Sequence, residues 1–155
     1  MKNWEKFGSY KQRGEWVELQ FMAQAAERRF AVCKPWGEMR PYDVGIEHGP
    51  NFLRVQVKST SYRLGAGYLS QLLPSHQKEP GYTIKQVDLF AAYVIPVATW
   101  YLIPAALLLE PRTVTSIMLC PVVPPVKKKS YRYECYKEAW NLLTKSRQEL
   151  RKYKR

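Results

Sequence analysis

The chain has 155 residues, of which 46% are hydrophobic and 25% charged, and these values fit one compact domain and exclude a disordered chain or a fibrous repeat. Its charge is unusual, because 25 Lys and Arg stand against 13 Asp and Glu, a formal net charge of +12. A surplus of this size repels itself and indicates an anionic partner, either nucleic acid or an anionic membrane surface.

The positive charge is concentrated near the C-terminus. Residues 127–155 contain eleven Lys and Arg against three Glu, so this segment alone carries +8. Such a block is either an arm that contacts phosphates or a solvated, solubilising tail, and charge alone does not decide between the two.

The first half of the chain predicts a helix followed by strands. Residues 13–30 carry apolar side chains at helical spacing, with no Pro and with Gly only at position 14, near the start. Residues 31–33 and 42–47 predict short strands, and His48-Gly49-Pro50-Asn51 is a turn sequence. Residues 52–59 alternate between apolar and polar side chains, as expected for a strand with one buried face.

The second half contains an uncharged stretch, residues 89–109, that is long enough to span a bilayer. Pro96 and Pro104 interrupt it, so we interpret residues 87–95 and 99–103 as two buried strands and expect no membrane partner. Residues 61–82 are rich in Gly, Pro and Ser and predict a loop or flap.

The last elements expected are a short helix from Pro104, a strand at 113–120 and a helix at 131–153. The whole chain, 1–155, is thus expected to form a single α/β (α+β) domain with a central sheet. The three Cys residues lack metal-site or disulfide spacing, and the N-terminus lacks an apolar signal core, so we expect a cytoplasmic protein.

Three polar residues are expected to meet on the predicted hairpin. If the turn is centred between Gly49 and Pro50, Asp43 faces Gln56, and Lys58 shares the face of Gln56. A carboxylate and an amide oxygen suit a hard cation such as Mg²⁺, and a helix carboxylate from Glu18 or Glu15 would complete the site. The alternative is an ordinary polar sheet edge on which Lys58 pairs with Asp43.

A family resemblance favours the metal site. The run Lys11-Gln-Arg-Gly-Glu-Trp-Val-Glu18, then Pro35, Tyr42-Asp43-Val44 and Arg54-Val-Gln-Val-Lys58, resembles the PD-(D/E)XK nuclease superfamily. Within it the chain is most similar to intron-encoded homing endonucleases, with archaeal Holliday-junction resolvases further off. The resemblance implies a restriction-endonuclease-like fold, with a central mixed sheet flanked by helices and an αβββαβ core. It implies a catalytic core at about residues 11–110, followed by the basic segment 127–155.

The resemblance also implies roles for the residues that match the motif. Glu18 would assist metal binding, Asp43 would be the principal ligand of Mg²⁺ (or Mn²⁺), the carbonyl of Val57 a further ligand and Lys58 the catalytic lysine. Gln56 departs from the pattern, since the superfamily normally has Asp or Glu there, although some homing enzymes have Gln. With the neutral amide of Gln56 in place of a carboxylate, the site has one negative charge fewer, and we expect it to bind the metal more weakly.

The leading hypothesis is therefore a Mg²⁺-dependent endonuclease of double-stranded DNA that acts as a homodimer or higher homo-oligomer. A catalytically inactive nucleic-acid-binding relative and a peripheral membrane protein are the alternatives. Basic and aromatic side chains of the 61–82 segment and of the C-terminal segment are expected to contact DNA, namely Arg63, Tyr68, Lys78, Lys127, Lys128, Lys129 and Arg132.

Overall fold

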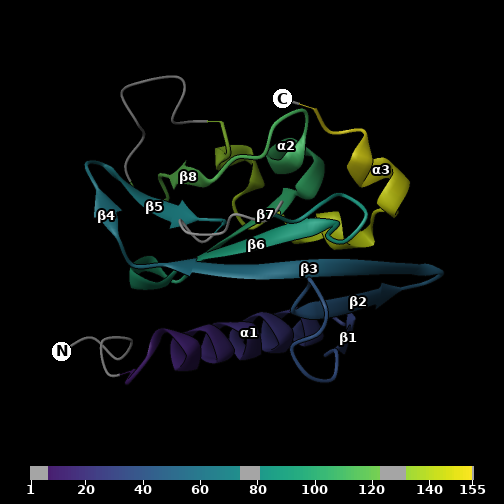
Figure 1. Ribbon diagram of the computed structural model, residues 1–155. Helices are drawn as coiled ribbons and strands as arrows, with labels where there is room; N and C mark the ends of the chain where they lie inside the picture. The colour runs from purple at the N-terminus through teal and green to yellow at the C-terminus, as the bar shows by residue number, and fades with distance from the viewer. Residues whose placement is uncertain (1–6, 74–80, 123–131, 155) are drawn as a thin grey trace.

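The computed structural model describes residues 7–73, 81–122 and 132–154. Its first element is the helix α1, Tyr10–Glu27, which starts earlier and ends earlier than expected (Figure 1). Ser9 caps the helix by accepting a hydrogen bond from the Gln12 backbone N–H, and Arg29 ends it with a φ of 66°. Val17, Phe21 and Ala25 repeat every four residues and form the buried face.

The central sheet has five strands in the order β1-β2-β3-β6-β7. They are β1 (Ala31–Cys33), β2 (Val44–His48), β3 (Asn51–Thr60), β6 (Leu89–Val94) and β7 (Thr99–Pro104). Only the β3–β6 pair is parallel, so the sheet is mixed. The two strands expected around Pro96 are confirmed as β6 and β7, joined by the short 3-10 helix η2, Ile95–Val97.

A smaller sheet was not expected. It consists of β4 (Arg63–Leu64), β5 (Gly67–Gln71) and β8 (Ser116–Leu119), in that order. The interpretation of residues 61–82 as a loop is therefore wrong for 63–71, because β5 pairs with β8, which lies far along the chain. Gly67 allows this pairing, since a Cβ there would come within 2.7 Å of the Leu119 carbonyl oxygen.

Both faces of the central sheet are covered. The helix α1 lies along one face, and the helix α2 (Ala105–Leu109) and the smaller sheet lie on the other (Figure 1). Accordingly the buried residues form two clusters, with Val55 and Val57 of β3 in the cluster that includes α1. Phe90 and Ala92 of β6 belong to the second cluster, together with α2.

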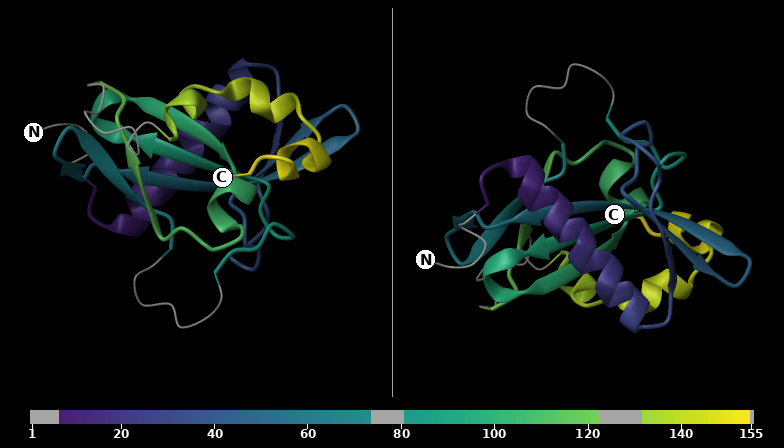
Figure 2. Two further views of the ribbon diagram at one scale, coloured as in Figure 1. Left: turned by 90° about the horizontal axis from the view of Figure 1, so that it is seen from above. Right: turned by 90° about the horizontal axis from the view of Figure 1, so that it is seen from below.

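The prediction of one helix at residues 131–153 is wrong. This segment forms the 3-10 helices η4 (Glu134–Tyr136) and η5 (Trp140–Thr144) and the helix α3 (Arg147–Arg151). Glu138 interrupts it with a φ of 50°, and its carboxylate accepts hydrogen bonds from Trp100 N and Trp140 Nε1, both at 2.7 Å. The long-range hydrogen bond to Trp100 and the local one to Trp140 override the helical pattern. Figure 2 shows the segment wrapping around the central sheet.

The expected fold class is confirmed: a mixed sheet flanked by helices. The order of elements in the core differs from the expected αβββαβ in one respect. Among the described residues no helix lies between β3 and β6, and the helix α2 follows β7. Within the described ranges no helix is long and apolar enough to cross a bilayer.

Candidate active site

Asp43 and β3 meet as the sequence predicts. Val44 pairs with Val55 in the expected register, and the Asp43 backbone N–H extends the ladder to the Val55 carbonyl at 2.9 Å. The Oδ2 atom of Asp43 accepts two hydrogen bonds, from Gln56 Nε2 at 2.6 Å and from the Val57 backbone N–H at 2.7 Å. Asp43, which directly precedes β2, is thus fixed by three hydrogen bonds to β3.

The ionisation of Asp43 is perturbed. Its pKa is raised from 3.8 to about 6, chiefly by burial; the Val57 N–H opposes the rise, and the nearby negative charge of Glu18 contributes to it. The positive charges of Lys58 and Lys34 act in the opposite direction. A carboxylate whose pKa is raised by burial and by a second acid suits the binding of a cation, which would favour its charged form.

Lys58 and Gln56 lie on the sheet face away from α1. Val55 and Val57 pack with α1, and side chains alternate along a strand, so Gln56 and Lys58 point to the other face. They pair in register with Phe90 and Ala92, which belong to the second core cluster. Asp43 directly precedes β2, and charges from both sides of the sheet act on its carboxyl, Glu18 from α1 and Lys58 from the other face.

Lys58 has a specific partner. Its Nζ lies 3.2 Å from the hydroxyl oxygen of Tyr82 and 5.2 Å from the centroid of the same ring. Tyr82 in turn packs edge-on against Phe90, with ring centroids 5.6 Å apart. The hydrogen bond and the cation–π contact together orient the ammonium group. Sequence reasoning did not link Tyr82 to Lys58, since 24 residues separate them.

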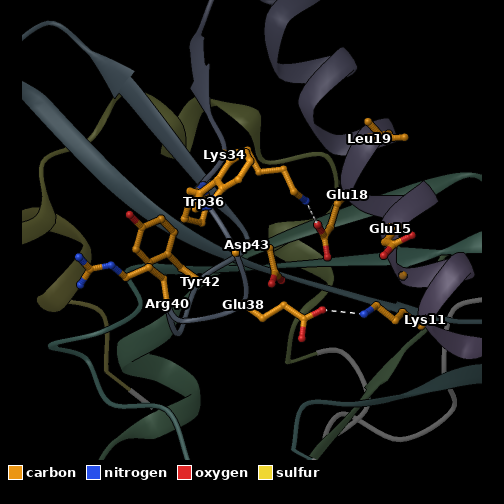
Figure 3. Close-up of a pocket in the computed structure, with 13 residues that line it drawn as sticks. Lys11, Glu15, Glu18, Leu19, Lys34, Trp36, Glu38, Arg40, Tyr42 and Asp43 are labelled. Atoms are coloured by element: carbon orange, nitrogen blue, oxygen red, sulfur yellow. Dashed lines mark hydrogen bonds and ion pairs between the residues drawn. The ribbon is translucent and has the colours of Figure 1, made fainter.

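Glu18 approaches from the α1 side. It forms an ion pair with Lys34, which follows β1, and it lies with Asp43 on the wall of an open cleft of about 810 Å³. Figure 3 shows Glu18 and Glu15 on α1 and Asp43 across from them. Of the predicted site residues, the structure places Gln56 and Val57 in contact with Asp43, while Glu18 and Lys58 act on its charge and contact Lys34 and Tyr82.

The donor set fits a hard divalent cation. Asp43 and Glu18 supply two carboxylates within electrostatic range of each other, and such oxygen ligands are those that Mg²⁺ prefers. In a strand the N–H and C=O of one residue point to the same side, and the Val57 N–H points to Asp43. The Val57 carbonyl therefore points to the same edge. Within the described residues no group of three His, Cys, Asp or Glu forms a metal site by side chains alone.

The predicted DNA-contacting residues have different surroundings. Arg63 in β4 and Arg132 before η4 are exposed. Tyr68 in β5 is half-buried and packs against the second core cluster, so only part of its surface faces solvent. The other predicted contacts, Lys78 and Lys127–Lys129, lie outside the described residues.

A buried charge cluster fixes β3 beside the site. Asp88 accepts hydrogen bonds from the guanidinium group of Arg54 at 2.9 and 3.0 Å, from the Arg54 backbone N–H at 2.9 Å and from Arg147 at 3.1 Å. Burial alone would raise the pKa of Asp88, but the contacts with Arg54 and Arg147 hold it below its usual value. Asp88 follows no motif, and only its position before a buried strand could have indicated this role.

Comparison with known protein families assigns the chain to one of them. Residues 9–142 match the sequence profile of the PD-(D/E)XK endonuclease family. The chain therefore belongs to this family, as its motif residues indicated. A search among curated proteins found no match.

The fold is shared with a solved homing endonuclease. The bacterial enzyme I-Ssp6803I is 24% identical, with a TM-score of 0.71, over 89% of this chain and 93% of that chain. The Holliday junction resolvase Hjc of Archaeoglobus fulgidus shows a weaker similarity, 16% identical with a TM-score of 0.48, over 68% of this chain and 84% of that chain. The first similarity supports the restriction-endonuclease-like fold.

Proposed function

We propose that the protein is a Mg²⁺-dependent DNA endonuclease that hydrolyses phosphodiester bonds. The observation that carries this proposal is the set of groups around Asp43: the Gln56 amide and Val57 backbone in contact with it, and the charges of Glu18 and Lys58 acting on it. Membership of the PD-(D/E)XK endonuclease family supports the same chemistry.

Asp43 and Glu18 are the residues that would hold Mg²⁺ (or Mn²⁺), with the Gln56 amide oxygen and the Val57 carbonyl as neutral ligands. A bound cation of this kind supplies positive charge that polarises a phosphoryl oxygen. The two hydrogen bonds to its carboxylate hold Asp43 in a fixed position relative to β3, so a cation bound there would also have a defined position. Glu18 would give up its ion pair with Lys34 to take its ligand role.

Lys58 acts on the other side of the phosphate. Its ammonium donates a hydrogen bond toward the charge that develops on the phosphoryl oxygens, or orients the attacking water. Tyr82 holds the ammonium group in place before the substrate binds. Lys58 is therefore the catalytic residue whose removal should lower the rate without unfolding the protein.

Basic residues outside the catalytic site would bind the DNA backbone. The net charge of +12 favours a polyanion, and the exposed side chains of Arg63 and Arg132 are candidates for phosphate contacts, with Tyr68 as a partly accessible neighbour. The chain acts as one nuclease domain, and cleavage of both strands of a duplex requires two sites. We therefore expect a homodimer or a higher homo-oligomer on DNA.

One observation favours a second candidate, a DNA-binding relative without cleavage. The Gln56 amide donates a hydrogen bond to Asp43 at 2.6 Å, and this contact satisfies the buried carboxylate without any cation. A site that is stable in this form needs no metal for folding. The protein would then bind DNA through its basic surface alone.

Supercoiled plasmid separates the two candidates. The purified protein is incubated with plasmid in MgCl₂, in MnCl₂ and in EDTA, and binding to a labelled duplex is measured in EDTA. Nicked or linear plasmid that appears only with the metals supports the nuclease. Binding without cleavage in either metal, on plasmid and on branched DNA, identifies the inactive relative.

A further inference from the structure

An exposed tryptophan stands at the mouth of the candidate active-site cleft. The side chain of Trp36 is 98% exposed and that of Met39 91% exposed, although both are large and apolar. The other tryptophans in the described parts of the chain, Trp16, Trp100 and Trp140, are buried or half-buried. Trp36 also lines the cleft that holds Asp43 and Glu18 (Figure 3).

The backbone on either side of Trp36 is conformationally restricted. Pro35 precedes it with a fixed φ, and Gly37 follows it with a φ of 69°, a conformation that side chains rarely adopt. The loop from Lys34 to Asp43 contacts α1 at two points, by the ion pairs Lys34–Glu18 and Lys11–Glu38. Before a cation binds, the loop that carries Trp36 is thus held next to α1.

The charges of this loop favour a polyanion over a second copy of the protein. Lys34 and Arg40 flank Trp36 and line the same cleft. Glu38 is the acidic residue between them, and it is paired with Lys11 at 2.7 Å. A second copy of this loop would place like charges against Lys34 and Arg40, whereas DNA supplies both phosphates for these cations and flat apolar bases for the indole.

We propose that Trp36 stacks on a nucleobase of bound DNA, next to the phosphate that reaches Asp43. The inference rests on the proposed function, because it takes DNA as the ligand of the cleft. The base is either already unpaired in the substrate, or it is separated from its neighbour when the indole inserts between base pairs. In both cases the stacked ring sets which phosphate enters the site.

The test measures binding in EDTA by fluorescence anisotropy. The three labelled probes are a 20-mer of thymidylates, a paired 20-bp duplex and the same duplex with one unpaired base. Trp36→Ala is expected to weaken binding of the single strand and of the unpaired duplex at least about fivefold, and Trp36→Phe to retain most of the affinity. If Trp36→Ala also weakens binding of the fully paired duplex, the indole inserts between base pairs.

Tyr10→Ala is the matched control, because Tyr10 is 84% exposed on α1 and does not line the cleft. It should bind all three probes like the wild type. Affinities for Trp36→Ala within twofold of the wild type on every probe would overturn the inference, as would an equal loss in Trp36→Phe or in Tyr10→Ala. A change of mass in sedimentation velocity with unchanged DNA affinity would assign Trp36 to self-association instead. Failure of the wild type to bind any probe would reject the proposed function itself.

Discussion

The amide nitrogen of Gln56 lies 2.6 Å from Oδ2 of Asp43, at the position where the family pattern has a second carboxylate. Here the neutral side chain donates a hydrogen bond to the acid, whereas a carboxylate would repel it. The site is therefore stabilised before any cation binds.

Gln56→Glu should destabilise the protein without metal and increase its response to metal. The substitution removes a hydrogen bond to a charged group and adds a second negative charge, with an expected cost of about 1.5–3 kcal/mol. The melting temperature in EDTA should fall by about 3–10 °C. Adding MgCl₂ should raise the melting temperature of the variant more than that of the wild type, because two carboxylates bind the cation more strongly than one. Gln148→Glu, at an exposed position in α3, is the control and should show no metal response.

Asp43→Asn should change the dependence of stability on pH. The native pKa of Asp43 is about 6 against an ordinary 3.8, so the folded state holds a proton that the unfolded state releases between these values. The contribution of Asp43 to the free energy of unfolding is therefore fully present below about pH 4. It falls as the pH rises to about 6, and above that pH it stays constant at its lower value. Urea unfolding in EDTA should show the wild type losing on the order of 2–3 kcal/mol relative to Asp43→Asn between pH 4 and pH 7. A constant difference would mean that Asp43 has an ordinary pKa.

Tyr82→Phe should lower kcat about tenfold with little change in KM. The variant loses the hydroxyl that contacts Lys58 but keeps the ring against Phe90, so the fold is retained. One hydrogen bond that orients a charged catalytic group contributes about 1.4 kcal/mol, equal to this factor in rate. Single-turnover and steady-state cleavage of plasmid in MgCl₂ supply the two constants. Equal rates for Tyr82→Phe and the wild type would remove Tyr82 from the account, and Tyr10→Phe is the control.

Asp88→Asn should lower the free energy of unfolding more than the substitution of any exposed charged residue. Asp88 is almost fully buried and pairs with Arg54, whose side chain is 15% exposed, and with the more exposed Arg147, so its loss leaves the charge of Arg54 without an anionic partner. A cost of about 3–5 kcal/mol is expected in urea unfolding at pH 7. The control is Glu38→Gln, which breaks the exposed pair with Lys11 and should leave stability unchanged. Similar midpoints for the two variants would contradict the role given to Asp88.

The hairpin could be predicted from the sequence because its information is local. A turn at Gly49-Pro50 and a period of two along β3 determine that Asp43 faces Gln56, and the observed register agrees. The pairing of β5 with β8 could not be predicted in this way, since the partner strand lies about 50 residues away and the segment is rich in Gly. Propensity also failed at Glu138, whose hydrogen bonds to Trp100 and Trp140 interrupt the helical pattern.

In the candidate site, too, the sequence predicted the local features but not the long-range contacts. The motif indicated Glu18, Asp43, Gln56 and Lys58, and their roles remain predictions. The partners that orient them, Lys34 for Glu18 and Tyr82 for Lys58, come from loops whose course depends on the folded sheet. Spacing along the chain carries no signal for such contacts. The exposure of Trp36 likewise becomes visible only once the rest of the chain has packed.

The most direct measurement of the central claim is the single-turnover rate of plasmid cleavage in MgCl₂ for four proteins: wild type, Asp43→Asn, Lys58→Met and Tyr10→Phe. The account predicts that the first two substitutions lower the rate at least about a hundredfold while DNA binding in EDTA persists. The Tyr10→Phe protein, changed at an exposed position of α1 that does not line the cleft, should cleave like the wild type. Cleavage that survives both Asp43→Asn and Lys58→Met at the wild-type rate would contradict the account.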